Sequence, residues 1–316
     1  MKVLANDGIS PLGKQLLEDN GYTVVTDTVP QDQLVETINK ENYEVLLVRS
    51  ATKVRTDIID GCANLKMIGR GGVGMDNIDV DYARKKGKFV FNTPAASSQS
   101  VAELVMAHLF GAVRFLHLSN RAMVTEGASN FKGLKKAYAK GIELRGKTLG
   151  IIGFGRIGQT VASYALGCGM KVVAFTPDMT TAKINITIEG HGNITIDIPS
   201  QSMEEVLKSS DFITLHTPSL AEPIMGKAQF DLMKNGTILV NAARGGVVDE
   251  DALIEALESG KLAHACLDVF ENEPNPRADL MTMANISLSP HIGAATEEAQ
   301  DRIGTELAEI IMNQNS

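Results

Sequence analysis

Two histidines and one arginine in the second half of the sequence have positions suited to acid–base and anion-binding chemistry. His216 and His291 each follow a predicted strand, where open α/β sheets bind ligands, and a histidine can accept or donate a proton near neutral pH. Position alone does not choose between them. Arg244, on a glycine-flanked loop, is either a clamp that holds a carboxylate through two hydrogen bonds or a surface arginine. Glu273 either orients a histidine or is a solvated loop acid.

The remaining four histidines have positions less suited to a site. They are interpreted as packing or solvated residues: His108 and His117 in a predicted long helix, His191 in a turn, and His264 just before a strand, at the edge opposite to the site.

A glycine motif lies between two predicted strands. An apolar run (149–152) leads into Gly153, Gly155 and Gly158, an amphipathic segment (157–166) follows, and a second apolar run (171–175) closes a βαβ unit. In such a unit the first glycine makes a tight turn, the second lets the backbone approach a pyrophosphate, and the third lets helix and strand pack closely. The whole unit predicts a dinucleotide site.

Residues 69–74 carry a second copy of the same glycine spacing, after another apolar run. This copy opens onto three carboxylates, Asp76, Asp79 and Asp81, near the start of the next predicted helix. Carboxylates there would occupy the positive end of the helix dipole and repel a pyrophosphate. The second motif therefore favours a glycine-rich turn that something else approaches.

The composition excludes several classes of protein. Acidic residues outnumber basic ones 38 to 30 in 316 residues, the net charge is -8, and no basic run suggests a nucleic-acid surface. No apolar stretch approaches the roughly 18 residues of a membrane helix, and the N-terminus turns polar too soon for a signal peptide. Three widely spaced cysteines in apolar contexts favour reduced thiols and a cytoplasmic protein. An anionic ligand would need a local basic cluster, for which the candidates are Arg49, Lys53, Arg70, Lys136 and Lys140.

Short apolar runs alternate with helical patterns, which predicts an α/β fold with parallel sheets. A capping-box pattern at Ser100–Glu103 predicts a long helix to about Val124, too apolar for a lone surface helix. Alternating isoleucines at 183–189 and 193–198 predict a β-hairpin around Gly190–Gly192. The predicted strands are 2–5, 22–26, 44–48, 65–68, 89–91, 149–152, 171–175, 212–215, 237–240, 265–270 and 286–289.

Six segments of the chain resemble the D-isomer-specific 2-hydroxyacid dehydrogenases, and among these the phosphoglycerate dehydrogenases. They are residues 48–54, 69–79, the glycine loop at 153–158, 241–249, 268–274 and 289–294. The resemblance implies two doubly wound domains, with a Rossmann-type NAD-binding domain (98–291) inserted in a flavodoxin-like substrate-binding domain (1–97 and 292–316). It also implies a last helix at 296–312, a reactant cleft between the domains, and a homodimer or homotetramer joined through the cofactor domain.

The resemblance also implies roles for individual residues. Arg244, Glu273 and His291 would be the catalytic residues, and Asp268 would hold the nicotinamide carboxamide. Cofactor contacts are expected from Val73, Gly153, Gly155, Arg156, Ile157, Gly158, Thr176, Thr217, Pro218, Ala242, Ala243, Arg244, Asp268, His291, Gly293 and Ala294. Substrate contacts are expected from Arg49, Ser50, Arg70, Gly71, Gly72 and Lys136, and no metal is expected.

The activity implied is NAD-dependent oxidation of 3-phosphoglycerate to 3-phosphohydroxypyruvate, in serine biosynthesis. The alternatives are a D-lactate, glyoxylate or hydroxypyruvate reductase and, from another class, a nucleotide-sensing corepressor. The family usually ends the strand after the glycine loop with an acid, whereas this chain has Thr176, so we expect NAD with NADP as a weaker second cofactor. The hairpin looks longer than the family's usual connection. Because the sequence ends at Ser316, we expect a short form without the C-terminal regulatory domain.

Overall fold

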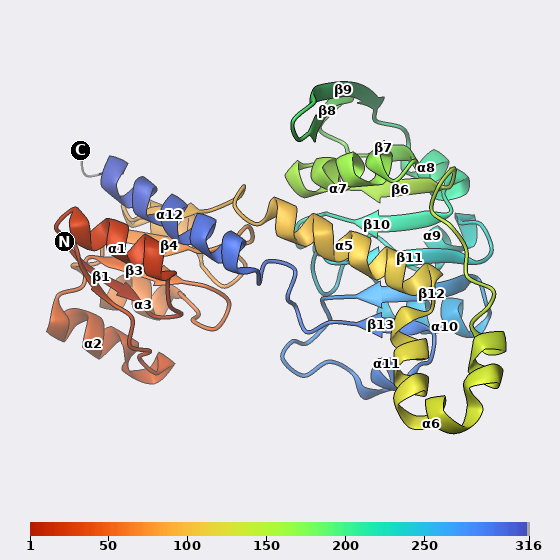
Figure 1. Ribbon diagram of the computed structural model, residues 1–316. Coiled ribbons are helices and arrows are strands. Elements are labelled where there is room, and N and C mark those ends of the chain that lie inside the picture. Colours follow the sequence, from red (N-terminus) through yellow and green to blue (C-terminus); the bar gives the residue numbers. More distant parts are fainter. Residues whose placement is uncertain (315–316) are drawn as a thin grey trace. The chain divides into compact units, whose positions relative to one another are not determined.

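The computed structural model describes residues 1–314, and the chain divides into two compact units (Figure 1). Unit 1 contains Met1–Ser98 and the C-terminal segment from Ala294, and unit 2 contains Gln99–Gly293. The boundaries expected from the sequence, 97/98 and 291/292, lie within two residues of these limits. The C-terminal segment therefore completes the N-terminal unit, and each unit has its own sheet.

Unit 1 is built on a five-stranded parallel sheet in the order β2-β1-β3-β4-β5, the flavodoxin-like order that the resemblance implies. Its strands are β1 (Lys2–Ala5), β2 (Thr23–Val25), β3 (Val45–Val48), β4 (Met67–Arg70) and β5 (Phe89–Asn92). Its helices are α1 (Pro11–Asp19), the 3-10 turn η1 (Gln31–Gln33), α2 (Leu34–Glu41), α3 (Thr56–Gly61), α4 (Val80–Lys85) and α12 (Glu297–Gln314).

Both faces of the unit 1 sheet are covered, because successive strand residues point to opposite faces. Leu46 belongs to a core shared with α2, α3 and α4, whereas its neighbour Val45 belongs to a core shared with α1 and α12. A Cβ added to Gly13 of α1 would lie 2.5 Å from the carbonyl carbon of Gly304 in α12. Glycine at these two positions thus lets the first and last helices pack in close contact.

Unit 2 contains a six-stranded parallel sheet in the order β13-β12-β11-β10-β6-β7, with cores on both faces. Its strands are β6 (Thr148–Ile152), β7 (Lys171–Phe175), β10 (Phe212–Leu215), β11 (Thr237–Asn241), β12 (Leu262–Leu267) and β13 (Ile286–Leu288). Its helices are α5 (Ser98–Val113), α6 (Leu116–Ala137), α7 (Arg156–Gly167), α8 (Met203–Ser209), α9 (Lys227–Leu232), α10 (Glu250–Glu258) and α11 (Ala278–Thr282).

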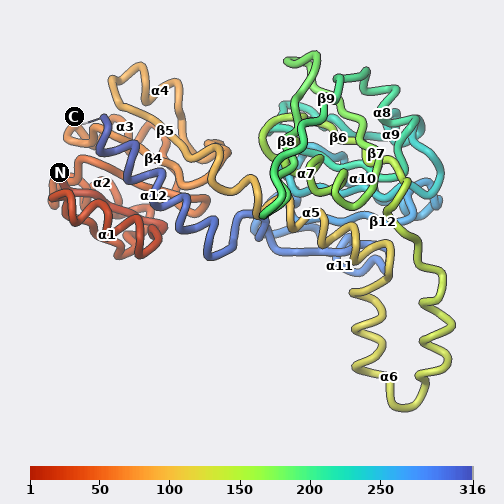
Figure 2. The backbone as a smooth tube through the Cα atoms, turned by 45° about the horizontal axis from the view of Figure 1, so that its top comes forward, coloured from red at the N-terminus to blue at the C-terminus, as the bar shows by residue number. Residues whose placement is uncertain are grey.

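The predicted helix from Ser100 to Val124 is wrong in its start and its length. The helix α5 begins at Ser98, and the Ser100 hydroxyl donates to the Gly293 carbonyl oxygen (2.6 Å) instead of capping the helix. The helix ends at Val113 because Phe115 adopts a left-handed conformation (φ 53°). The two halves of α6, on either side of its kink, then run out from the body of unit 2 and back (Figure 2).

No single helix within residues 1–314 is long and apolar enough to cross a membrane. The pair α5 and α6 passes the same test by length and composition only when taken together, and these helices are bent by 59°.

The predicted hairpin is confirmed as β8 (Thr181–Ile188) and β9 (Gly192–Pro199), an antiparallel pair. It follows β7, at the point where a Rossmann sheet would add a further strand. Ala182, Ile184 and Ile198 belong to the core of unit 2 that also contains residues of α7. One face of the hairpin therefore packs its apolar residues into the core that α7 also lines.

The strand predicted at 265–270 begins earlier, at Leu262, so the prediction that His264 precedes its strand is wrong. His264 lies inside β12 and is buried, and its Nε2 atom is 2.7 Å from the Ser287 hydroxyl of the neighbouring strand. A buried polar ring is tolerated in the strand because this hydrogen bond satisfies it.

Candidate active site

The carboxyl edge of the unit 2 sheet brings together the loops that the sequence singled out. The loop 242–246 follows β11, Asp268 follows β12 and residues 289–291 follow β13. The glycine loop follows β6, and His216 follows β10. Because all these strands are parallel neighbours, their ends lie at one edge, where α/β sheets bind ligands.

His291 and Glu273 form a hydrogen-bonded pair at this edge, with 2.7 Å between Nδ1 and Oε2. This hydrogen bond raises the pKa of His291 against the effect of burial, with further contributions from the charges of Glu273 and Asp268 and an opposing one from Arg244. The pair uses Nδ1, which leaves Nε2 as the ring nitrogen for a reacting group. His291 adopts a left-handed conformation (φ 54°) that costs a non-glycine residue about 1–2 kcal/mol.

Burial works against a charge on Glu273, but hydrogen bonds from His291 and from the Phe270 N–H, with the charge of Arg244, lower its pKa overall. The Phe270 N–H donates to Glu273 Oε1 over 2.9 Å, while Oε2 faces His291. The carboxylate is thus ionised and oriented by one backbone donor and one ring donor.

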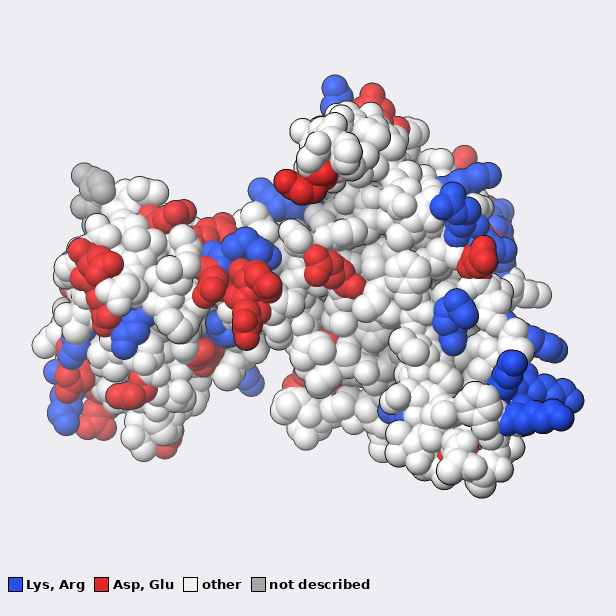
Figure 3. All heavy atoms as spheres, viewed as in Figure 1, with Lys and Arg blue, Asp and Glu red and all other residues white. Residues whose placement is uncertain are grey.

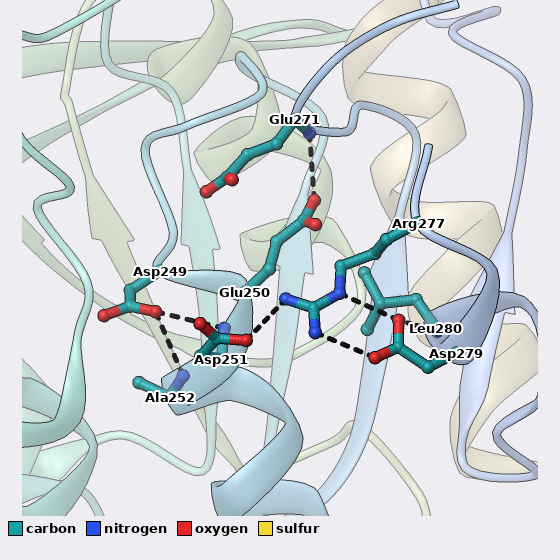
Figure 4. Close-up of polar contacts among 8 residues, drawn as sticks. All are labelled: Asp249, Glu250, Asp251, Ala252, Glu271, Arg277, Asp279 and Leu280. Atoms are coloured by element: carbon teal, nitrogen blue, oxygen red, sulfur yellow. Dashed lines mark hydrogen bonds and ion pairs between the residues drawn. The ribbon is translucent and has the colours of Figure 1, made fainter. Parts of the chain in front are cut away.

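The loop that carries Glu273 is anchored on both sides to α10 (Figure 4). Before it, the Glu271 N–H donates to the buried carboxylate of Glu250 over 2.9 Å. After it, the Arg277 guanidinium pairs with Asp251 (2.7 Å) and Asp279 (2.8 Å). These contacts fix the loop ends, so the position of Glu273 does not depend on its own pairing alone.

Arg244 lies on a loop whose backbone is held by Asn241. The Asn241 side chain donates to the Arg244 carbonyl (3.0 Å) and accepts from the Ala243 N–H (3.1 Å), while Arg244 Nη1 donates to the Ala243 carbonyl (2.6 Å). A Cβ on Gly245 would overlap the Phe270 carbonyl, so only glycine fits beside Arg244. The charge of Arg244 lowers the pKa of both Glu273 and His291, which places it within electrostatic reach of the pair.

Asp268 is buried and accepts three hydrogen bonds around the His291 turn. Its Oδ1 accepts from the Ser289 hydroxyl (2.6 Å) and the Ile292 N–H (2.9 Å), and its Oδ2 accepts from the Gly293 N–H (2.8 Å). The sequence singled out Asp268 and Gly293 but missed the link through Ser289, although Ser289 stands two residues before His291.

His216, the rival histidine, has a different environment. Burial lowers its pKa to about 3, and its Nε2 lies 3.0 Å from the Thr214 hydroxyl. Within the described residues its buried Nδ1 has no hydrogen-bond partner, and neither has the Thr217 hydroxyl beside it. A neutral ring without a carboxylate partner is a poor proton carrier near neutral pH, whereas two unmatched polar atoms at the carboxyl edge suit a polar ligand.

The glycine loop has the geometry that a dinucleotide requires. Gly153 has φ 93°, and a Cβ there would lie 2.6 Å from the His216 carbonyl carbon. Gly155 is the N-cap of α7, no side chain caps this helix, and its first turn contains no acid. A Cβ on Gly155 would meet only open space, whereas one on Gly158 would overlap the Gly153 carbonyl. The N–H groups of Arg156 and Ile157 therefore begin a twelve-residue helix with an open, uncapped end that fits a pyrophosphate.

Thr176 lies just beyond β7, where the adenine ribose of a dinucleotide is expected. Its N–H donates to the Ser200 hydroxyl (3.1 Å), which in turn donates to the Thr176 carbonyl (3.0 Å). Asp178 and Lys183 are exposed nearby in sequence. The end of the hairpin, at Ser200, thus fixes the backbone of the loop that would contact the ribose.

The candidate substrate residues of unit 1 lie on two clamped loops. Asp7 accepts from the N–H groups of Arg49 (2.6 Å) and Thr52 (3.1 Å), and the Asn77 amide donates to the Arg49 carbonyl (2.8 Å). Burial lowers the pKa of Arg49, while the charge of Asp7 raises it. The sequence missed Asp7, although it stands two residues after β1, and it missed Asn77.

The second glycine motif forms the other loop of unit 1. Gly72 has φ 138° and exchanges hydrogen bonds with Thr93, and the Asn92 amide donates to the Val73 carbonyl over 2.6 Å. A Cβ on Gly71 would lie 3.1 Å from Ile303 of α12. This loop therefore follows β4 as a fixed turn and does not open a helix, since α4 begins only at Val80.

The remaining predicted residues have no common environment. Pro218 is exposed beyond β10, and Ala294 accepts a hydrogen bond from Gln300 (2.7 Å) at the start of the last segment of unit 1. Ser50 is exposed, and Lys136 is exposed on the last turns of α6, where basic side chains gather (Figure 3). In the described chain no hydrogen bond or ion pair joins Lys136 to the catalytic candidates. No group of residues within 1–314 could hold a metal ion.

The fold and this edge of the sheet agree with a family model. Residues 106–293 match the NAD binding domain of the D-isomer specific 2-hydroxyacid dehydrogenases. The chain belongs to this family. The match covers β6, α7 and their glycine loop, so this loop lies within the family's NAD-binding domain.

Two relatives and one solved structure extend the likeness to the whole chain. The chain is 43% identical over 313 residues to D-3-phosphoglycerate dehydrogenase of Methanocaldococcus jannaschii, and this match covers 98% of this chain and 57% of that protein. It is also 43% identical over 321 residues to hydroxypyruvate reductase of Thermotoga maritima, and this match covers 99% of this chain and 98% of that protein. The crystal structure of D-lactate dehydrogenase from Aquifex aeolicus with NAD and lactic acid has a TM-score of 0.77 at 29% identity, covering 100% of this chain and 95% of that one.

Proposed function

We propose that the protein is an NAD-dependent dehydrogenase that oxidises D-2-hydroxy acids at C2 and reduces the corresponding 2-oxo acids. The observation that carries this proposal is the His291–Glu273 hydrogen bond, which keeps an acid–base group available at the carboxyl edge of the sheet. The positive charge of Arg244 within reach of this pair supports an anionic substrate. The uncapped end of α7 supports a dinucleotide.

When bound, the nicotinamide ring supplies the hydride acceptor or donor. In the oxidation, His291 Nε2 accepts the proton of the C2 hydroxyl as the C2–H bond breaks, and in the reduction it returns a proton to the C2 oxygen. Glu273 holds Nδ1, which fixes the tautomer and stabilises the imidazolium that forms. Arg244 binds the substrate carboxylate and polarises the C2 oxygen through its guanidinium.

We propose 3-phosphoglycerate as the substrate. Relatives named D-3-phosphoglycerate dehydrogenase support this choice. The hydroxypyruvate reductase of Thermotoga maritima is equally similar, at 43% identity, and matches over 98% of its length. The chain spans about 57% of the first of these relatives. Two basic residues of unit 1 favour a phosphorylated substrate in a protein of net charge -8: Arg49, on the loop held by Asp7, and Arg70, the last residue of β4.

A panel of 2-oxo acids tests the activity and the substrate together. We expect NADH oxidation with 3-phosphohydroxypyruvate at ordinary enzyme rates, about 1–10³ per second, and a lower kcat/KM with hydroxypyruvate, glyoxylate and pyruvate. Equal kcat/KM for hydroxypyruvate and its phosphorylated form would contradict the substrate but not the reaction. Failure with every 2-oxo acid would favour the nucleotide-sensing corepressor instead.

We expect NADH to be preferred over NADPH only modestly, by roughly tenfold in kcat/KM. Thr176 can bond a ribose hydroxyl but has no charge to repel a 2′-phosphate, and no arginine follows β7 to bind one. Thr176→Asp should restore an acid at this position and increase the preference for NADH.

The matched control for this cofactor prediction is Asp178→Asn. A wild-type preference for NADPH would overturn the prediction and point to a phosphate-binding group such as Lys183. Near-absolute selectivity for NADH that disappears in Asp178→Asn would show that Asp178 supplies the missing charge.

We further propose a homo-oligomer in the cytoplasm. Unit 2 exposes large apolar side chains along α6, namely Leu116, Met123, Val124 and Phe131, and a second copy could cover them. All three cysteines are free, as a reducing compartment requires.

A further inference from the structure

A hydrogen-bond chain runs from α5 to the turn that carries His291. His108 Nε2 lies 2.9 Å from the Ser289 hydroxyl oxygen, and that oxygen lies 2.6 Å from Asp268 Oδ1. His108 and Ser289 are 181 residues apart in sequence and belong to the same unit. Neither residue has a part in the reaction proposed above.

Counting donors fixes the direction of this chain. The Ser289 hydroxyl donates to Asp268 Oδ1, on the carboxyl group that also accepts from two backbone N–H groups. The Ser289 oxygen can then only accept from His108, which places a proton on Nε2 of that ring. Burial lowers the pKa of His108, opposed by the charge of Asp268 and assisted by that of His117, so the ring is mostly neutral at pH 7. Its single proton is therefore committed to Ser289.

The far end of the chain holds the His291 turn. Asp268 accepts from the N–H groups of Ile292 and Gly293, the two residues after His291. The Gly293 carbonyl accepts from Ser100 of α5 over 2.6 Å. The hydrogen bonds of Ile292 and Gly293 thus keep the left-handed backbone at His291 in place. The two N–H bonds depend on the position of a single carboxylate, that of Asp268.

We propose that Ser289 and His108 are positioning residues, which fix the Asp268 carboxylate and through it the His291 turn. Without the Ser289 hydroxyl, Asp268 loses one of its three donors. The turn is then less firmly held, and the position of the His291 ring relative to the Glu273 carboxylate is no longer fixed. The charged groups that face His291 are Glu273, Asp268 and Arg244. Glu273 and Asp268 raise the pKa of His291, so loosening the contacts with these two carboxylates lowers that pKa towards the ordinary value of about 6.5. This inference rests on the proposed role of His291 for its effect on turnover only.

The test compares Ser289→Ala with Ser289→Thr, which keeps a hydroxyl, and with His108→Leu. The matched control is Ser287→Ala, because Ser287 is a buried serine of β13, the strand that leads to Ser289, and lies 2.7 Å from His264 and 3.3 Å from His117 but is not bonded to Asp268. The pKa of His291 is measured by NMR titration of its ring in the ligand-free protein, and kcat and KM are measured with the best 2-oxo acid of the panel.

Ser289→Ala should lower the His291 pKa and reduce kcat by about tenfold with little change in KM, since small misplacements of a reacting group are costly. His108→Leu should also lower the His291 pKa and kcat. Ser289→Thr should retain the wild-type His291 pKa, because it keeps the hydroxyl. An unchanged His291 pKa in Ser289→Ala would overturn the proposal, as would an equal shift in Ser287→Ala. If the wild-type protein turns over no 2-oxo acid, the proposed function fails, and the NMR titration alone decides this inference.

Discussion

His291→Ala is expected to lower kcat by about 10²- to 10⁴-fold, the usual contribution of a positioned acid–base group, with little change in the affinity for NADH. In the structure His291 is bonded to an ionised Glu273 through Nδ1, so alanine removes the proton carrier and leaves the glycine loop untouched. Stopped-flow turnover and NADH fluorescence titration measure the two quantities separately.

The pH dependence gives a second measurement of the same role. The pKa of His291 is raised above 6.5, so the protonated form needed for the reduction persists to higher pH than in a free histidine. The rate of reduction should therefore fall as pH rises through this pKa, and the rate of oxidation should rise. Glu273→Gln removes the main cause of the shift and should move both limbs to lower pH.

Two other histidines make this prediction specific. His191→Ala, in the exposed hairpin turn, should leave kcat and the pH profile unchanged. His216→Ala should affect cofactor affinity more than kcat, because its ring is neutral and its backbone carbonyl lies beside Gly153 of the glycine loop. Near wild-type turnover in His291→Ala together with loss in His216→Ala would reverse the assignment of the two histidines.

The regular elements were predictable because each depends on local patterns. Apolar runs of four or five residues became buried parallel strands, and alternating isoleucines became the β8–β9 pair. The long helix failed because no propensity rule signals the left-handed Phe115. The prediction that Ser100 caps this helix is wrong for another reason. Its hydroxyl fits a capping pattern but donates instead to the carbonyl of Gly293, a residue 193 positions away.

The candidate site was predictable in its residue types but not in its connections. Sequence position placed His216 and His291 at the same edge and could not separate them, whereas burial and a carboxylate partner do. The partners that hold the candidate residues stand well outside their local sequence: Asp7 is 42 residues from Arg49, and Ser289 is 21 residues from Asp268. Such contacts depend on the packing of the fold and leave no local spacing to detect.

Arg244→Ala is expected to lower kcat/KM for the 2-oxo acid by about 30- to 4,000-fold, because truncating one partner of a charged hydrogen-bonded pair typically costs about 2–5 kcal/mol. Arg244→Lys should recover only part of this loss, since a lysine keeps the charge but not the two parallel donors. Arg121→Ala, an exposed arginine on α6, is the control and should behave as the wild type. Wild-type kcat/KM in Arg244→Ala would contradict the role of Arg244 in substrate binding.

The His291 pKa separates this loss of binding from a collapse of the loop. The charge of Arg244 opposes protonation of His291, so its removal should raise the His291 pKa and move the fall of the reduction rate to higher pH. This shift is opposite to that expected for Glu273→Gln. If the loop between β11 and α10 collapsed instead, the Glu273 contact would loosen and the His291 pKa would fall. A raised His291 pKa together with a lowered kcat/KM therefore shows that Arg244 acts on the substrate as a cation. It also shows that Arg244 is not needed to hold His291 in place.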